Sequence, residues 1–200
     1  MTRSIDVTYG NISADEAERL ALAVGHYSDS PAGNTEPWIT NLVVALLKAS
    51  GARTVLETGA FQGATSEELL FALGELEGGV LTICEIDPAR AEAVDARLRD
   101  AECENSDVHW VVRCMDARDV IRSLAPQSLG FVFLDDDHQK SHVAEEIELL
   151  LPKMLPGGLL VFHDVYGVCD LQEVVAAYGG YSLDLPRAGP AGGLGIIQVR

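Results

Sequence analysis

The amino-acid sequence predicts an α/β protein built on a doubly wound, mostly parallel β-sheet. Five short apolar runs alternate with segments of helical periodicity from about residue 54 to residue 178. Strands that alternate with helices form parallel sheets with right-handed crossovers. The last two apolar runs are separated by a loop rich in Pro and Gly and by no helix, which indicates a hairpin. We therefore expect seven strands, of which the C-terminal two form an antiparallel hairpin.

The elements follow in order along the chain. Ser13 and Glu16 have the spacing of a capping box and predict a short N-terminal helix. The apolar spacing over Trp38–Lys48 predicts a second helix before the first strand. Strands are expected over residues 54–58, 80–84, 108–112, 130–134 and 158–162, helices over 66–73, 88–100, 117–124, 142–151 and 170–178, and the hairpin over 181–186 and 193–200.

Composition narrows the range of functions. With 14 Lys and Arg against 31 Asp and Glu, the formal net charge is −17, which repels phosphate backbones and argues against nucleic acid as a partner. No run approaches the ~20 consecutive apolar residues of a membrane span, and the polar first 16 residues lack a signal core. We expect a cytoplasmic protein without a membrane partner. The four cysteines are far apart and should be reduced thiols.

A glycine-containing loop follows the first strand. The sequence Glu57-Thr58-Gly59-Ala60-Phe61-Gln62-Gly63-Ala64-Thr65 leads directly into a helix. Glycine lets the backbone approach a ligand, and the free amides at a helix start favour an anionic group. Ligands of doubly wound sheets bind at this edge. An ordinary tight turn is the alternative, because two glycines four residues apart are weak evidence.

Acidic residues end the next two strands. Glu85, followed by Ile86, stands where such folds bind a ribose diol, and a carboxylate can accept hydrogen bonds from both hydroxyls. A solvated charge at the end of the strand is the alternative. Asp87 before Pro88 is better explained as a helix N-cap. Asp116, followed by Ala117, could accept a hydrogen bond from an adenine amine, act as an N-cap, or do both, while Met115 packs on the ring.

The segments VLETGAFQGATS, LTICEIDP and VVRCMDARDV together resemble class I S-adenosylmethionine-dependent methyltransferases, especially the catechol and caffeoyl-CoA O-methyltransferase group and its bacterial small-molecule relatives. The resemblance covers about residues 38–200 and implies a Rossmann-like seven-stranded sheet. We expect one methyltransferase domain over residues 1–200, with a helical segment over 1–50 and a cofactor-binding core over 51–200. The expected cofactor contacts are Glu57, Gly59, Ala60, Phe61, Gly63, Thr65, Glu85, Ile86, Asp116, Ala117 and Asp135.

The predicted fourth and fifth strands are followed by residues whose side chains can bind a metal ion. Asp135-Asp136-Asp137-His138 follows the fourth strand, and His163-Asp164 follows the fifth. Neighbouring parallel strands bring these ends together, and their O and N ligands suit Mg²⁺ or a similar divalent ion. In the resembled enzymes, Asp135 and Asp164 correspond to metal ligands and the next position is Asn, but here it is Val165. We therefore expect Asp135, His163 and Asp164 to be the ligands. Helix caps and solvated acids are the alternative.

His138 is the candidate catalytic base. It stands where the resembled plant and animal enzymes carry the lysine that takes the acceptor proton, and a neutral imidazole can accept that proton. His142 could substitute for it, and a histidine packed at a helix start is the alternative. His26 and Trp38 could belong to a lid or acceptor wall.

Three functions remain open from the sequence. The first is metal-assisted O-methylation of a small hydroxylated molecule. The second is metal-independent methylation of nitrogen or another ready nucleophile, and the third is a non-catalytic cofactor-binding module. The partner is expected to be a small-molecule acceptor, and a homo-oligomer is possible through the N-terminal helix or the hairpin. Acceptor walls are expected in variable loops, such as residues 26–37 and 165–170.

Overall fold

The computed structural model describes residues 35–101, 107–166, 170–185 and 192–200. The chain divides into two units, Met1–Ala32 and Gly33–Arg200, and every described residue belongs to the second unit. The predicted N-terminal helix after Ser13 and the role of His26 lie outside the described residues. The division of residues 1–200 into a helical segment and a core stays a prediction.

A seven-stranded sheet forms the centre of the second unit, in the order β3-β2-β1-β4-β5-β7-β6. Neighbouring strands are parallel from β3 to β5, and β7 runs antiparallel to both β5 and β6. This confirms the predicted fold class and its antiparallel hairpin. The strands are β1 Thr54–Thr58, β2 Gly79–Cys84, β3 Val108–Arg113, β4 Leu129–Leu134, β5 Met154–Phe162, β6 Tyr181–Leu183 and β7 Leu194–Gln198.

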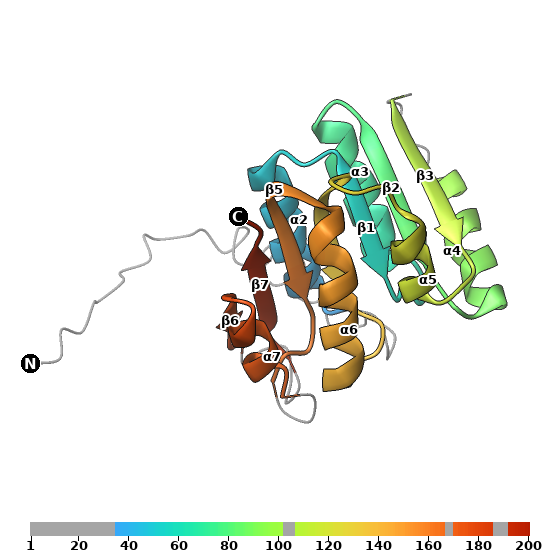
Figure 1. The fold of residues 1–200 in the computed structure, drawn as a ribbon. Coiled ribbons are helices and arrows are strands. Elements are labelled where there is room, and N and C mark those ends of the chain that lie inside the picture. Colours follow the sequence, from blue (N-terminus) through green and yellow to red (C-terminus); the bar gives the residue numbers. More distant parts are fainter. Residues whose placement is uncertain (1–34, 102–106, 167–169, 186–191) are drawn as a thin grey trace, which may run out of the picture. The chain divides into compact units, whose positions relative to one another are not determined.

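Helices cover both faces of the sheet (Figure 1). Ile39, Leu69 and Val94 belong to one buried apolar cluster, while Ile121, Ile147 and Val175 belong to a second. The first cluster includes residues of α2, α3 and α4, and the second includes residues of α5, α6 and α7. The helices are α2 Pro37–Ser50, α3 Ala64–Glu75, α4 Pro88–Asp100, α5 Ala117–Ser123, α6 Lys140–Leu150 and α7 Gln172–Ala177, with a 3₁₀ turn η1 at Leu151–Lys153.

The central strands are buried on both faces. Every residue of β4 is buried, including Phe131 and Phe133, and β1 is buried from Val55 onward. Continuous apolar strands of this kind are typical of parallel sheets covered by helices on both sides. The rigid centre fixes the ends of β1, β2, β4 and β5, where the candidate site residues lie.

The observed starts of α4 and β5 compare differently with the predicted ones. The Asp87 side chain accepts hydrogen bonds from the backbone N–H groups of Ala89 and Arg90, which confirms it as the N-cap of α4. β5 differs from its prediction, since it begins at Met154, four residues earlier than expected, and its pairing with β4 shifts between Leu129 and Phe131. The Pro-Gly-Gly sequence concealed this extension, because Pro and Gly are usually signals of turns. None of the helices in the described ranges is long and apolar enough to cross a membrane.

Candidate active site

A cleft of about 750 Å³ opens at the carboxyl ends of the parallel strands. Its volume lies in the range of small-molecule sites, and its position is the one that doubly wound sheets use for ligands. The predicted cofactor contacts that line it are Gly59, Phe61, Glu85, Ile86, Asp116, Ala117 and Asp135. Glu57, Ala60, Gly63 and Thr65 are absent from its lining, and their contact with a cofactor stays a prediction.

Gly59 lets the first loop pass against the end of β4. Its φ of +76° is in the left-handed region, and a Cβ atom at this position would lie 2.3 Å from the backbone oxygen of Asp135. No side chain fits there. Gly63 also has a φ of +76°, but its Cβ would face the side chain of Val94 at 3.3 Å, so this glycine serves the packing of α3 on α4.

Glu85 holds the loop in place. One carboxylate oxygen accepts a hydrogen bond from the backbone N–H of Phe61 at 2.8 Å, and the other accepts from the N–H of Asp87 at 2.9 Å. A carboxylate has about four lone-pair positions, so the two oxygens keep capacity to accept from a ligand diol. Glu85 is buried yet lines the cleft.

At the β3 end, Asp116 is the N-cap of α5 and also pairs with Arg118. Its side chain accepts from the backbone N–H of Arg118 at 2.9 Å and from the guanidinium at 2.6 Å and 3.0 Å. The hydrogen bond from Arg118 lowers the pKa of Asp116 to about 2, so this group is a carboxylate at neutral pH. Met115 is exposed beside it in the cleft.

Glu57 has a different environment, since it is buried beneath the loop and accepts a hydrogen bond from the Ser66 hydroxyl at 2.5 Å. Burial raises the pKa of Glu57 to about 8, and the negative charges of Asp135 and Glu85 add to this effect. The carboxyl is therefore largely protonated at neutral pH, and through Ser66 it links β1 to α3.

Asp135 joins the ends of β4 and β5. Its Oδ1 accepts a hydrogen bond from Nδ1 of His163 at 2.7 Å, and its Oδ2 accepts from the hydroxyl of Thr35 at 2.6 Å. The other ring nitrogen of His163 lies 3.0 Å from a carboxylate oxygen of Glu36. Burial alone would lower the pKa of His163, but the carboxylates of Asp135 and Glu36 outweigh it and raise the pKa to about 10.

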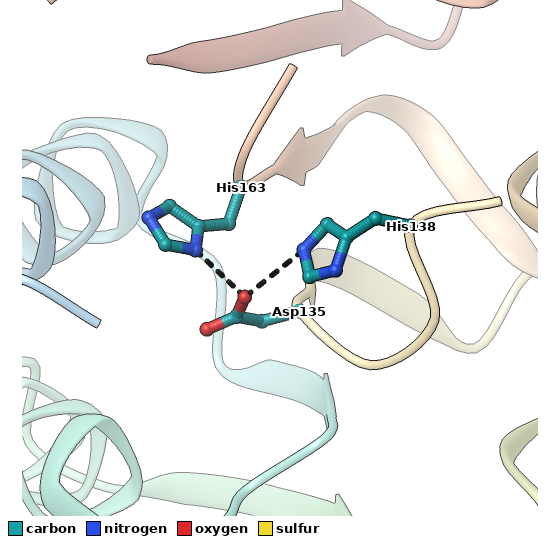
Figure 2. A group of neighbouring side chains, drawn as sticks. All are labelled: Asp135, His138 and His163. Atoms are coloured by element: carbon teal, nitrogen blue, oxygen red, sulfur yellow. Dashed lines mark hydrogen bonds and ion pairs between the residues drawn. The ribbon is translucent and has the colours of Figure 1, made fainter. Parts of the chain in front are cut away.

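His138 lies on the other side of the same carboxylate oxygen, as Figure 2 shows. Its Nε2 is 3.4 Å from Oδ1 of Asp135 and is buried, without a hydrogen-bond partner of good geometry among the described residues. Burial lowers the pKa of His138, but the polar contact with the Asp135 carboxylate and the charges of Asp135 and Asp164 outweigh burial, so the pKa lies above its usual value.

The structure therefore groups three residues closely, namely Asp135, His138 and His163, whose donor atoms all lie within 4.8 Å of one another. Asp164, a predicted metal ligand, lies at the edge of this group, with its Oδ1 3.4 Å from Nε2 of His163. Its backbone has a φ of +49°, a conformation uncommon outside glycine and a frequent mark of functional sites. Whether Asp135, His163 and Asp164 hold a metal stays a prediction.

A second group of donors lies along α6. Asp136, His142 and Glu146 also have donor atoms within 4.8 Å of one another, and Asp136 and His142 line the cleft. Burial raises the pKa of Glu146 to about 9, and the neighbouring Asp136 adds to the rise. From the sequence, His142 is expected only as a substitute for His138 as the base.

Sequence reasoning missed Thr35 and Glu36. Both stand in the turn-rich stretch before α2, and their partners Asp135 and His163 are 100 and 127 residues away along the chain. They reach the ends of β4 and β5 because they stand at the N-terminal end of α2, whose buried face belongs to the apolar core. No local sequence pattern marks them.

Comparison with known proteins agrees with this geometry. A family profile described as "Methyltransferase domain" matches residues 56–165, more than half of the chain. The chain belongs to this methyltransferase family. A protein of Mycolicibacterium vanbaalenii named "Putative O-methyltransferase" is 30% identical to the methyltransferase over 159 residues, which are 78% of this chain and 67% of that protein.

Solved structures share the fold of the methyltransferase. An O-methyltransferase from Bacillus cereus, in complex with SAH, superposes with a TM-score of 0.69 at 20% identity and covers 94% of this chain and 93% of its own. The O-methyltransferase TomG from Streptomyces achromogenes, in complex with SAM, gives a TM-score of 0.65 at 21% identity, with coverage of 94% and 91%. The prediction of a class I S-adenosylmethionine-dependent methyltransferase is thus confirmed.

Proposed function

We propose that this methyltransferase methylates a hydroxyl group of a small molecule. The observation that carries the proposal is that Asp135, His138 and His163 meet in the same cleft that is lined by Gly59 and Glu85. A carboxylate and two imidazoles are groups that hold or move a proton, and a neutral hydroxyl must lose its proton before it attacks a methyl group. An amine that is already nucleophilic would not need them.

The methyl donor would occupy the side of the cleft formed by the loops after β1, β2 and β3. Glu85 would accept hydrogen bonds from the ribose hydroxyls, and Met115 and Asp116 would bind the adenine. The ends of β3 and β5 are four strand spacings apart, about 19 Å. That length suffices for the donor and a small acceptor in line, and in-line positioning is the main requirement of methyl transfer from a sulfonium.

His138 would take the acceptor proton. Its ring lines the cleft, and the buried Nε2 faces Oδ1 of Asp135, so Nδ1 would be the nitrogen that accepts the proton of the substrate. The carboxylate of Asp135, 3.4 Å away, would stabilise the imidazolium that forms.

A divalent ion such as Mg²⁺ would be held by Asp135, His163 and Asp164. The donors present are two carboxylates and an imidazole, which fit such an ion in type. When bound, the ion would lower the pKa of an acceptor hydroxyl. His163 would first have to lose its proton to either carboxylate neighbour or solvent, because an imidazole binds a metal only through a free lone pair.

A second candidate is a metal-independent methyltransferase in which the same cluster only orients the acceptor. The observation in its favour is that His163 hydrogen bonds to Asp135 at 2.7 Å and lies 3.0 Å from Glu36, with a pKa of about 10. A protonated His163 would then satisfy two carboxylates without an ion.

The experiment is methyl transfer from isotopically labelled S-adenosylmethionine to a set of phenols, catechols and amines, followed by mass spectrometry. The protein is first treated with a chelator and then assayed with and without Mg²⁺ or Mn²⁺. Formation of O-methylated products only in the presence of the ion supports the proposal. The Asp164→Asn variant should then need a higher Mg²⁺ concentration to reach half of its maximal rate. Oxygen products that form equally well without the ion support the second candidate. Labelling on nitrogen alone would contradict O-methylation.

A further inference from the structure

The carboxyl group of Glu146 is buried and lacks a hydrogen bond to the described residues. Glu146 belongs to α6, its side chain is 0% exposed, and neither of its carboxyl oxygens has a hydrogen-bond partner among the described residues. Buried polar atoms of native proteins are nearly always satisfied, so an orphaned pair of oxygens indicates a missing ligand, ion or water. Arg118, whose charge reaches Glu146, is already hydrogen bonded to Asp116 and Glu145.

The neighbours of Glu146 are metal donors. Nε2 of His142 lies 3.7 Å from Oε2 of Glu146 and 3.3 Å from Oδ2 of Asp136. In a tetrahedral zinc site with bonds of about 2.0–2.1 Å, two ligand atoms are separated by roughly 3.4 Å. The two distances in this group are close to that separation. Without an ion, the 3.3 Å contact is a hydrogen bond between Nε2 of His142 and Asp136. The 2.7 Å contact between Asp135 and His163 is clearly shorter than the separation of two ligands of one ion.

The second ring nitrogen of His142 has a carboxylate nearby. Nδ1 lies 3.7 Å from Oδ2 of Asp137. On ion binding, a small rotation of either side chain would let Nδ1–H donate to Asp137. The ion would then replace the hydrogen bond that Nε2 makes to Asp136. Metal-binding histidines usually have such a carboxylate partner.

We propose that Asp136, His142 and Glu146 form a second divalent-cation site, distinct from the Asp135 cluster and suited to Zn²⁺ or a similar ion. Two carboxylates and one imidazole match this class of ion, and Glu146 would release its proton when the ion binds. The cleft lined by Asp136 and His142 gives an entry path and room for a water ligand. Because Asp136 lies in the loop after β4 while His142 and Glu146 belong to α6, the ion would fasten that loop, which carries His138, to the helix.

The test uses calorimetric titration with ZnCl₂ in a His138→Ala/His163→Ala background, which disables the Asp135 cluster. We expect this background protein to bind one Zn²⁺. Adding His142→Ala should weaken Zn²⁺ binding more than about 100-fold, because it removes a ligand. Adding Asp137→Ala should weaken it by about 10–100-fold, the typical effect of losing a side chain that only orients a ligand. Adding His109→Ala, which removes an exposed histidine of β3, should change nothing. No Zn²⁺ binding by the background protein, or equal binding after His142→Ala, would overturn the proposal.

A thermal measurement gives a second readout in the otherwise unaltered protein. An ion that binds only the folded state raises the melting temperature. Zn²⁺ should therefore raise the melting temperature of the wild type and of the Glu85→Ala variant. The rise should be smaller for Glu146→Gln, which keeps the side-chain volume. Circular dichroism establishes that each variant is folded. An equal Zn²⁺-induced rise in Glu146→Gln would remove Glu146 from the site. This proposal does not depend on O-methylation, because neither readout uses methyl transfer.

Discussion

Oδ1 of Asp135 and Nδ1 of His163 lie 2.7 Å apart and join the carboxyl ends of β4 and β5 by a hydrogen bond. Both side chains are largely buried, at 14% and 7% exposure, so the ion pair is poorly screened by solvent. The same oxygen lies 3.4 Å from His138. These three residues therefore act as one unit, and the effects of their substitutions should not be additive.

His138→Ala tests the proton-accepting role. Removal of a general base typically costs 10²–10⁴-fold in rate, so turnover of a hydroxyl acceptor should fall by roughly this factor while the affinity for S-adenosylhomocysteine is kept. The measurement is kcat with an acceptor found by mass spectrometry, alongside calorimetric affinity. His109→Ala is the matched control, because His109 is exposed on β3 far along the sheet from β4. Near-normal turnover of His138→Ala would leave His138 as a structural residue.

Gly59→Ala should destabilise the protein more than Gly51→Ala does. Both glycines have positive φ, +76° and +66°, so each substitution carries the left-handed backbone cost of about 1–2 kcal/mol. A Cβ at Gly51 meets nothing within 4 Å, whereas one at Gly59 meets the Asp135 backbone at 2.3 Å. The clash should add about 1–3 kcal/mol, measured by urea unfolding. Equal losses in the two variants would show that the close approach to β4 has no energetic consequence.

Glu57 gives a pH dependence of stability. Its pKa is raised by burial to about 8 in the folded protein, against 4.5 for the unfolded chain. The folded state thus holds the proton more tightly, and this stabilisation is present below pH 4.5 and is lost as the pH rises to about 8. Glu57→Gln stays neutral, so relative to wild type its unfolding free energy should increase over this window by a few kcal/mol.

The measurement for Glu57 is urea unfolding of wild type and Glu57→Gln at several pH values from 4 to 9. Exposed Glu92→Gln is the control and should follow the wild type. A constant difference between Glu57→Gln and wild type across the window would mean that Glu57 is ionised in the folded protein.

Much of the fold could be predicted from the sequence because its signals are local. The strand Thr54–Thr58 and the helix Pro88–Asp100 have the predicted bounds, since an apolar run and an Asp-Pro N-cap mark them within a few residues. β5 was predicted too short because Pro156 and Gly157 stand inside its extended segment. Here pairing with β4 at Met154 overrides the local preference for a turn.

The candidate site was only partly predictable for a related reason. Asp135 and His163 could be paired in advance, because adjacent parallel strands bring their ends together. The hydrogen bond from Thr35 to Asp135 and the contact of Glu36 with His163 could not be predicted, because they depend on where α2 packs. His138, and not Asp164, completes the close group with Asp135 and His163. This depends on the loop conformation, which a sequence pattern does not specify.

The central claim is that the cleft at the strand ends binds S-adenosylmethionine with Glu85 on the ribose, and calorimetric titration with S-adenosylhomocysteine tests it most directly. Glu85→Gln keeps the side-chain volume but lowers the capacity to accept hydrogen bonds. We expect the wild type to bind one equivalent, and Glu85→Gln, folded by circular dichroism, to bind at least about tenfold more weakly, since a hydrogen bond to a charged group contributes about 1.5–3 kcal/mol. Absence of binding by the wild type, or equal affinity of the variant, would contradict the claim.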